Sequence, residues 1–326
     1  MPANLTPDYL AADRAFKEAK TDEERIAALE EMLRTIPKHK GTDKMQADIK
    51  RRISKVRQAA EKQSAKKGGF SHRVLPEGAG QIALAGGPNT GKSRLLKALT
   101  NAEPQVAPYP FTTVLPMPGM MDFEDIQIQL VDLPPFSPDH TESWLPEMFR
   151  AANAVMMVLD LSGDPLQDYD FIIERLDKVK ICLVRDPDPE APFNISQKRT
   201  MIVCNKLDAD GAAENFEALR ELIGERFPMI AVSVEQGTHL DLLRRAAFDL
   251  LQIIRIRPKE PGKPASKDQP FTVPRGSNLM DFAKVVHKDF ENLKYARVWG
   301  LSSRFDGQTV TRDHILADGD IVELHL

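Results

Sequence analysis

The chain has 326 residues, of which 42% are apolar and 28% charged, and its formal net charge is -4. This length allows about two domains and a smaller appendage. No run approaches the roughly 18 consecutive apolar residues of a membrane-spanning helix, and the N-terminus lacks the apolar run of a signal peptide, so we expect a cytoplasmic protein without a membrane partner.

The first 68 residues read as three helices with a basic surface. Capping signals open helices at Thr6 and Thr21, and a third helix is expected over residues 42–63. Residues 34–67 carry twelve Lys and Arg against three acids, an excess of nine positive charges. Such a segment attracts phosphate backbones, although a charge run is more often only a solvated helix face.

Between residues 78 and 258, short apolar strands alternate with helices. This alternation predicts an α/β fold, a domain with a mostly parallel sheet and helices on both faces. A continuous apolar run at residues 156–158 is typical of a central strand, whereas the alternating segment 126–131 suits an edge or antiparallel strand. The expected strands are residues 81–85, 117–122, 126–131, 154–160, 200–204 and 229–232. Cys182 and Cys204 lie in apolar, strand-like runs and are expected to be free buried thiols.

The first expected strand of this domain leads into the motif Gly86–Ser93. It reads G-G-P-N-T-G-K-S, the phosphate-loop pattern G-x-x-x-x-G-K-[ST], and a helix is expected directly after it. In this pattern backbone N–H groups surround phosphate oxygens, Lys92 neutralises the outer phosphates, and the Ser93 hydroxyl binds Mg²⁺. The residues expected to contact a nucleotide here are Gly87, Pro88, Asn89, Thr90, Gly91, Lys92, Ser93 and Arg94.

Two further segments are expected to close on the phosphates. Residues 109–113, Tyr-Pro-Phe-Thr-Thr, lie between the first helix and the next strand, and we expect Thr113 rather than Thr112 to bind Mg²⁺ beside the γ-phosphate. Asp132 ends the strand 126–131 and is expected to hold Mg²⁺ through water. The predicted metal site therefore consists of Ser93, Thr113 and Asp132.

The base of the nucleotide is expected to be selected by an N-K-x-D run that follows an apolar strand, Asn205-Lys206-Leu207-Asp208. An acid at Asp208 accepts hydrogen bonds from the N1–H and the exocyclic amine of guanine. Adenine offers no matching donors, so a buried carboxylate facing it would stay unpaired. Lys206 is expected to cover the ring and Asn205 to brace neighbouring loops. Ser233 and Val234 follow the next strand, where a backbone N–H reaches the guanine O6.

The C-terminal part begins after a change in composition. Residues 258–268 are rich in Pro, Gly and Lys and are interpreted as a linker. Residues 268–326 are expected to form a compact α+β unit. Its expected elements are a strand at 271–273, a helix at 279–288, and strands near 296–300 and 321–326.

Together these motifs resemble those of translation-factor GTPases of the Obg and DRG (developmentally regulated GTP-binding protein) type. Segments 271–276, 294–300 and 318–322 resemble a TGS domain, a ubiquitin-like β-grasp module. The basic run 40–57 resembles the helical segment that precedes the GTPase domain in DRG proteins. The matching GTPase pieces are Gly86–Ser93, residues 109–113, Asp132-Leu133-Pro134 and Asn205–Asp208.

The resemblance implies binding of GTP and GDP, hydrolysis of GTP, and association with the ribosome or RNA; no DNA partner is predicted and no oligomeric state is indicated. In relatives with an asparagine at the position of Asn89, this residue helps to hold a K⁺ ion that neutralises charge in the transition state. The resemblance thus implies Mg²⁺ and K⁺ as cofactors. It also implies catalytic roles for Lys92, Thr113 and Asn89.

The chain departs from the family at Pro135. Family members usually read D-x-P-G, and the glycine N–H donates to the γ-phosphate, but proline has no N–H. Phe136 follows, so no glutamine stands at the adjacent position to orient water. We predict slow intrinsic hydrolysis and a muted response to GTP. The alternative is a hydrolysis-deficient guanine-nucleotide-binding scaffold, whereas Asp208 disfavours an ATPase or nucleotide kinase.

Overall fold

The computed structural model forms two compact units, residues 1–71 and 72–326. It describes residues 28–29, 31–32, 34–35, 74–100, 115–136, 142–266, 269–287, 290 and 293–325. In the first unit the described residues are helical, and Leu29 and Met32 are buried, within the helix predicted to begin at Thr21. The predicted helices that begin at Thr6 and at residue 42 lie outside the described residues.

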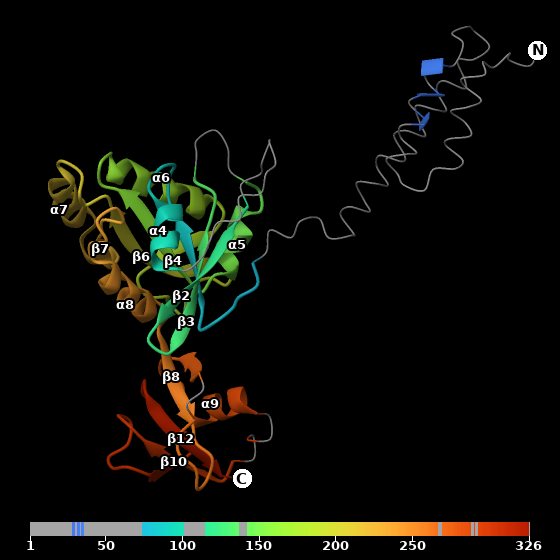
Figure 1. Cartoon of the computed structure of the whole chain (residues 1–326), viewed down its shortest axis with the longest axis vertical. Helices are drawn as coiled ribbons and strands as arrows, with labels where there is room; N and C mark the ends of the chain where they lie inside the picture. The colour runs from blue at the N-terminus through green and yellow to red at the C-terminus, as the bar shows by residue number, and fades with distance from the viewer. Residues whose placement is uncertain are drawn as a thin grey trace, which may run out of the picture. The chain divides into compact units, whose positions relative to one another are not determined.

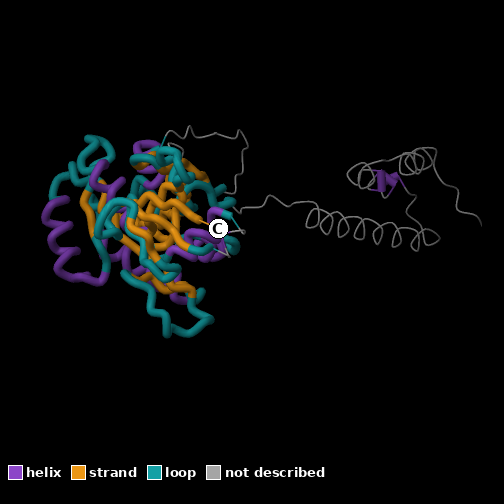
Figure 2. Tube along the Cα trace, turned by 90° about the horizontal axis from the view of Figure 1, so that it is seen from below, coloured by secondary structure: helices purple, strands orange, loops and turns teal. Residues whose placement is uncertain are grey.

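A sheet of seven strands, counted over the described residues, forms the centre of an α/β domain (Figures 1 and 2). Its strands are β1 Gln81–Ala85, β2 Met117–Phe123, β3 Ile126–Asp132, β4 Ala154–Asp160, β5 Ile181–Val184, β6 Ser196–Asn205 and β7 Met229–Ala231. The order is β2-β3-β1-β4-β6-β5, with β7 also paired to β6. The pairing of β2 with β3 is antiparallel and the other strand pairs of this sheet are parallel. The prediction of a mostly parallel sheet is confirmed.

Helices cover both faces of this sheet, and side-chain alternation along the strands explains why. In β4, Val155 and Met157 point into one core while Met156 and Val158 point into the other. The helices α5, α6 and α7 pack on the first face, and α4 and α8 pack on the second. Their bounds are α4 Lys92–Leu99, α5 Leu145–Ala151, α6 Pro165–Lys178, α7 Ala212–Ile223, with a 3₁₀ turn at Gly224–Arg226, and α8 Leu240–Leu251.

The predicted central position of β4 is confirmed, and of the two alternatives for residues 126–131, an edge or an antiparallel strand, the antiparallel one is confirmed. β3 lies between β1 and β2, and β2 is the edge of the sheet. Alternation in β3 reflects its antiparallel partner rather than an edge position. Cys204 is buried and Cys182 half-buried, and both are free thiols.

A second sheet and one helix form a C-terminal domain within the same unit. Its elements are β8 Ile253–Pro258, β9 Phe271–Pro274, α9 Leu279–Val286, β10 Tyr295–Trp299, β11 Gln308–Val310 and β12 Asp320–His325. Over the described residues the strand order is β11-β10-β12-β8-β9, and β8 runs parallel to β12. Leu279, Phe282 and Ala283 of α9 are buried in its core. A hairpin, a helix and a last strand parallel to the first make a β-grasp fold, as predicted.

The interpretation of residues 258–268 as a linker between domains is wrong. β8 pairs with β9, so this stretch is the connection between two strands of one sheet, and Lys259 forms a bridge with Ala265 inside it. The C-terminal sheet therefore begins at Ile253, before the predicted boundary at residue 258. Proline- and glycine-rich composition marks a hairpin connection and a linker equally well. Strand β11 was also absent from the prediction.

Among the helices that the structure describes, none combines the length and apolar character that a membrane span requires.

Candidate functional site

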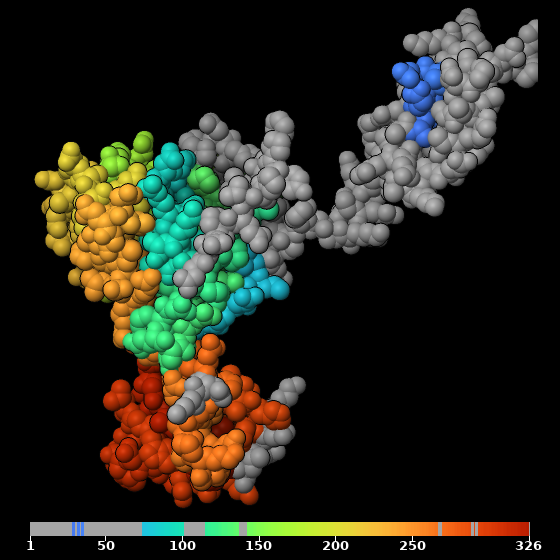
Figure 3. Space-filling model, viewed as in Figure 1, coloured from blue at the N-terminus to red at the C-terminus, as the bar shows by residue number. Residues whose placement is uncertain are grey.

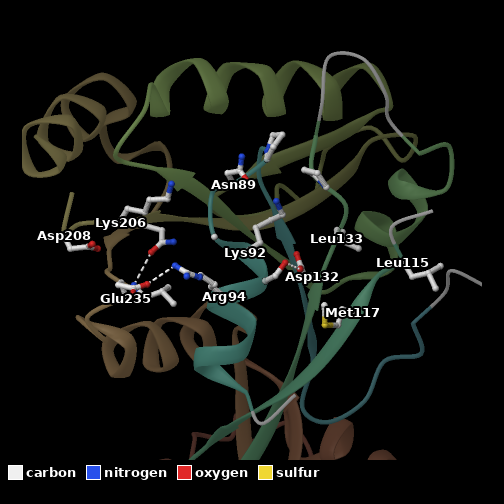
Figure 4. Close-up of a pocket in the computed structure, with 16 residues that line it drawn as sticks. Asn89, Lys92, Arg94, Leu115, Met117, Asp132, Leu133, Lys206, Asp208 and Glu235 are labelled. Carbon is white, nitrogen blue, oxygen red and sulfur yellow. Dashed lines mark hydrogen bonds and ion pairs between the residues drawn. The ribbon is translucent and has the colours of Figure 1, made fainter. Parts of the chain in front are cut away.

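A pocket of about 800 Å³ lies beyond the carboxyl ends of β1, β3 and β6 (Figure 4). β1 lies between β3 and β4, and the strand order runs from it toward both edges of the sheet. Open α/β sheets bind ligands at such a point. The predicted residues that line it are Pro88, Asn89, Gly91, Lys92, Ser93, Arg94, Asp132, Asn205, Lys206, Asp208 and Val234. Leu115, Met117, Leu133, Pro135 and Glu235 complete the lining. The tertiary structure thus brings together segments from five parts of the chain.

The phosphate loop is held in its turn by a close approach of Asn205. Gly91 has φ +92, and a Cβ placed on it would lie 2.3 Å from Asn205 Nδ2. Asn205 Nδ2 donates to the Thr90 carbonyl (3.0 Å), and the Val234 N–H donates to Asn205 Oδ1 (3.3 Å). Asn205 therefore joins the phosphate loop to the loop after β7, the bracing contact expected of it. Only glycine fits at position 91.

Lys92 places a buried ammonium group at the phosphate end of the pocket. Its Nζ donates to the carbonyls of Gly86 (3.0 Å) and Gly87 (2.8 Å), and 6% of the residue is exposed. Burial lowers the pKa of Lys92 to about 8, although Asp132 and Asp168 act in the opposite direction. A desolvated cation here suits an anionic ligand, because a phosphate would stabilise its charged form.

Ser93 and Asp132 bring two hard oxygen ligands together. The Ser93 hydroxyl donates to the Asp132 carboxylate. The other oxygen of that carboxylate, Oδ1, is buried and has no hydrogen-bond partner among the described residues. Burial raises the pKa of Asp132. A hydroxyl and a carboxylate with an unused oxygen fit Mg²⁺, which prefers oxygen ligands. The predicted third ligand, Thr113, lies outside the described residues, as does Thr112.

At the opposite end of the pocket, Asp208 accepts a hydrogen bond from the Ser233 hydroxyl, whose oxygen accepts from the Gln236 N–H (3.0 Å). This pair links the N-K-x-D run to the loop after β7. Asp208 is exposed at the pocket rim, so the assumption that its carboxylate is buried is wrong. The reason is its position in the turn after β6 rather than in the strand itself.

Lys206 is oriented by an acid that the sequence analysis did not single out. Its Nζ donates to the Asp160 carboxylate at the end of β4, and its backbone has φ +65. Burial alone would raise the pKa of Asp160, but hydrogen bonds from Lys206 and Ser162 hold it below its usual value. The available signal was an acid at the end of the central apolar strand. β4 and β6 are adjacent and parallel, so their carboxyl ends meet here.

Arg94 and Glu235 form an ion pair at the pocket mouth (2.8 Å), drawn as a dashed line in Figure 4. Arg94 lines the pocket, and its side chain reaches the loop after β7; its predicted contact with the nucleotide stays a prediction. Both side chains are largely exposed, so we expect the pair to contribute little to stability.

The segment after Asp132 is anchored on both sides of Pro135. Leu133 and Phe136 are buried, and the Phe136 ring stacks on Phe149 with centroids 5.6 Å apart. The Phe136 N–H donates to the Gly86 carbonyl (3.2 Å). Pro135 lines the pocket between these anchors. Its backbone therefore borders the pocket without an N–H to offer.

The comparison with known proteins decides the family. Residues 81–206 match the family model for the 50S ribosome-binding GTPase, and residues 262–326 match the model for the TGS domain. Developmentally-regulated G-protein 1 of Arabidopsis thaliana is 27% identical over 92% of this chain and 90% of its own length. The chain belongs to the DRG-like GTPases with a TGS domain.

Other relatives agree with this assignment. A GTP-binding protein of Methanocaldococcus jannaschii, named as uncharacterized, is 28% identical over 93% of this chain and 92% of its own length. The GTPase Obg of Desulfitobacterium hafniense is 32% identical over 68% of this chain and 53% of its own length. This DRG-like GTPase is therefore a GTP-binding protein in which a G domain, the α/β domain described above, precedes a TGS domain.

Proposed function

We propose that this DRG-like GTPase binds GTP with Mg²⁺ and hydrolyses it slowly to GDP and phosphate. The supporting observation is that one pocket contains the phosphate loop, Asp132 and the N-K-x-D run. Lys92 and the loop N–H groups would neutralise and position the phosphates, and Asp208 would select guanine. Phosphoryl transfer requires mainly such positioning and charge stabilisation.

Ser93, Asp132 and Thr113 would hold Mg²⁺, which supplies positive charge at the β- and γ-phosphates when bound. Asn89 lies at the pocket rim with an exposed side chain and φ +60, and we propose from the family resemblance that it contributes to a K⁺ site. Lys92 would take part in transition-state stabilisation together with these groups.

Pro135 and Phe136 support the proposal that hydrolysis is slow. Pro135 offers no N–H to the γ-phosphate, and the Phe136 side chain is buried against Phe149 rather than directed at water in the pocket. The same observation supports the alternative function, a guanine-nucleotide-binding scaffold deficient in hydrolysis.

Single-turnover hydrolysis of GTP in K⁺ and in Na⁺ tests these proposals together. We expect turnover above the rate of free GTP, faster in K⁺ by about tenfold or more, since one charge-stabilising group contributes roughly 10²–10³ in rate. The variant Asn89→Ala should lose the difference between the two cations. Equal hydrolysis rates in both cations would contradict the proposed K⁺ site. A hydrolysis rate no higher than that of free GTP would favour the hydrolysis-deficient scaffold.

We further propose that the protein associates with the large ribosomal subunit through phosphate contacts of its basic N-terminal segment. The name of the family model that matches residues 81–206 and the excess of positive charge at residues 34–67 support this partner. Each phosphate contact releases counterions, so affinity should fall steeply with salt.

Co-sedimentation with 50S subunits at increasing KCl concentration measures that dependence. Replacing Lys50, Arg51 and Arg52 with Ala should reduce the slope of log affinity against log salt by about 2–3, because each neutralised phosphate adds roughly 0.7–0.9 to that slope. A control that removes three exposed charges of the G domain, Lys178, Lys180 and Arg185, should leave it unchanged. If association with the 50S subunit does not depend on salt, the basic segment makes no phosphate contacts and is only a solvated surface.

A further inference from the structure

The β2–β3 hairpin connects the nucleotide pocket with the TGS domain. At one end of the paired strands Met117 lies opposite Asp132, and both residues line the pocket. At the other end Phe123 lies opposite Ile126, and the turn between them consists of Glu124 and Asp125. The hairpin is continuously paired between these ends, so a displacement of its turn is transmitted along both strands.

The turn of this hairpin is held by Arg255 of β8, the first strand of the TGS domain. Arg255 Nη1 donates to Glu124 and to Asp125 (2.8 Å). Its Nη2 and Nε donate to the two carboxylate oxygens of Asp318 (2.7 and 3.1 Å), which lies in the turn before β12. One guanidinium group thus joins two carboxylates of the G domain to one of the TGS domain. A bidentate arginine contact fixes direction as well as distance.

The surroundings of Arg255 make this contact specific. Only 12% of its side chain is exposed, and the guanidinium lies 4.9 Å from the Phe248 ring centroid. Phe248 stacks on Phe123 of the hairpin, with centroids 5.0 Å apart. The Arg255 backbone N–H also donates to Asp318 (2.7 Å). Figure 3 shows the hairpin, in green, meeting the orange and red atoms of the TGS domain.

The contact between Arg255 and Asp318 favours the charged form of both side chains. The hydrogen bonds to Asp318 raise the pKa of Arg255 further above its usual value. Burial alone would raise the pKa of Asp318, but hydrogen bonds from Arg255 hold it below its usual value. Glu124 has φ +50, an unfavourable conformation for a residue with a side chain, which the contact with Arg255 helps to hold.

We propose that Arg255 is a positioning residue that couples the TGS domain to the Mg²⁺ and nucleotide site. It fixes the hairpin turn against the TGS domain and thereby fixes Asp132 at the far end of β3. A partner that displaces the TGS domain would then change the rate of nucleotide release. Because coupling free energies are reciprocal, bound nucleotide also favours the docked arrangement. This inference rests on the proposed function of the pocket.

The test measures dissociation of a fluorescent GDP analogue, with Mg²⁺ and again with EDTA, for the full chain. We expect Arg255→Ala to accelerate release about fivefold or more with Mg²⁺, within the usual range of coupling between sites. With EDTA the variant and wild type should release at the same rate, since the proposed effect acts through the Mg²⁺ ligand Asp132. With Mg²⁺, the release rate of Arg255→Lys should lie between those of wild type and Arg255→Ala, because one ammonium group cannot make all the hydrogen bonds of the guanidinium.

Lys259→Ala is the matched control. Lys259 lies just after β8, pairs with the buried Glu323 and lies 4.4 Å from the Trp299 ring centroid, all within the TGS domain. Its removal should lower the thermal unfolding midpoint without changing nucleotide release. Asp318→Asn, which weakens only the TGS side of the Arg255 contact, is a second test variant and should accelerate release in the same direction.

Three results would overturn the coupling alone: unchanged release in both Arg255→Ala and Asp318→Asn, equal acceleration with EDTA, or equal acceleration in Lys259→Ala. If the wild-type chain failed to bind the GDP analogue, the proposed function would fail and this inference with it. Guanine-nucleotide binding by wild type with unchanged variant rates would leave the proposed function intact.

Discussion

Replacement of Asp208 by Asn is expected to weaken GDP binding by about a hundredfold or more and to strengthen binding of xanthosine diphosphate. The carboxylate accepts hydrogen bonds from two guanine donors, and hydrogen bonds to charged groups contribute about 1.5–3 kcal/mol each. An amide presents a donor to one of those positions, where xanthine has an acceptor instead. Calorimetric titration with GDP, xanthosine diphosphate and ADP measures the three affinities.

Asp210→Asn is the control for this change. Asp210 is an acid two residues along the chain that does not line the pocket. In Asp208→Asn the side-chain amide oxygen would still accept from the Ser233 hydroxyl, so the loop after β6 should keep its conformation. An unchanged preference for guanine in Asp208→Asn would contradict the assignment of the base site, and tight ADP binding by wild type would indicate an adenine-nucleotide enzyme.

Replacement of Pro135 by Gly is expected to increase the preference for GTP over GDP by about tenfold or more. The new N–H gains a hydrogen bond to the γ-phosphate, and one hydrogen bond to a charged group contributes about 1.5–3 kcal/mol. Because Leu133 and Phe136 are buried on either side, the backbone at position 135 should stay beside the pocket after the substitution. The ratio of the two dissociation constants is the quantity to measure, with a nonhydrolysable GTP analogue.

Pro135→Ala separates the hydrogen bond from chain flexibility. Alanine also restores an N–H but leaves the unfolded chain less flexible than glycine does. Both variants should show the increased preference if the N–H is responsible. An increase confined to the glycine variant would assign the effect to flexibility, and a strong preference for GTP already present in wild type would contradict the muted response predicted from Pro135.

Most residues that line the nucleotide pocket could be predicted because they belong to short contiguous motifs. The glycines, Lys92 and Ser93 belong to one contiguous motif, and Asn205 and Asp208 lie at the end of β6 and in the turn directly after it. Their spacing is set by the ligand groups that such motifs contact. Strand alternation likewise predicted the two layers of helices, since a parallel sheet buried on both faces requires continuous apolar strands such as β4.

β8 shows why a strand pattern does not reveal the sheet to which the strand belongs. Ile254 and Ile256 are buried while Arg255 and Arg257 alternate with them on the other face, a clear strand pattern. That pattern does not indicate with which strand β8 pairs. Its partners β9 and β12 come later in the chain, and only the assembled sheet shows that β8 belongs to the TGS domain.

The sequence by itself predicted the residues of a guanine-nucleotide site, and it determined their order along the chain and the missing N–H at Pro135. Only the tertiary structure decided which distant groups meet. Asn205 reaches Thr90 across 115 positions and Arg255 reaches Asp125 across 130. Such contacts leave no periodic or compositional trace, because each depends on the packing of whole elements rather than on neighbouring residues. The sequence indicated that Asn205 braces neighbouring loops, but its partner Thr90 and the link between the two domains became visible only in the folded chain.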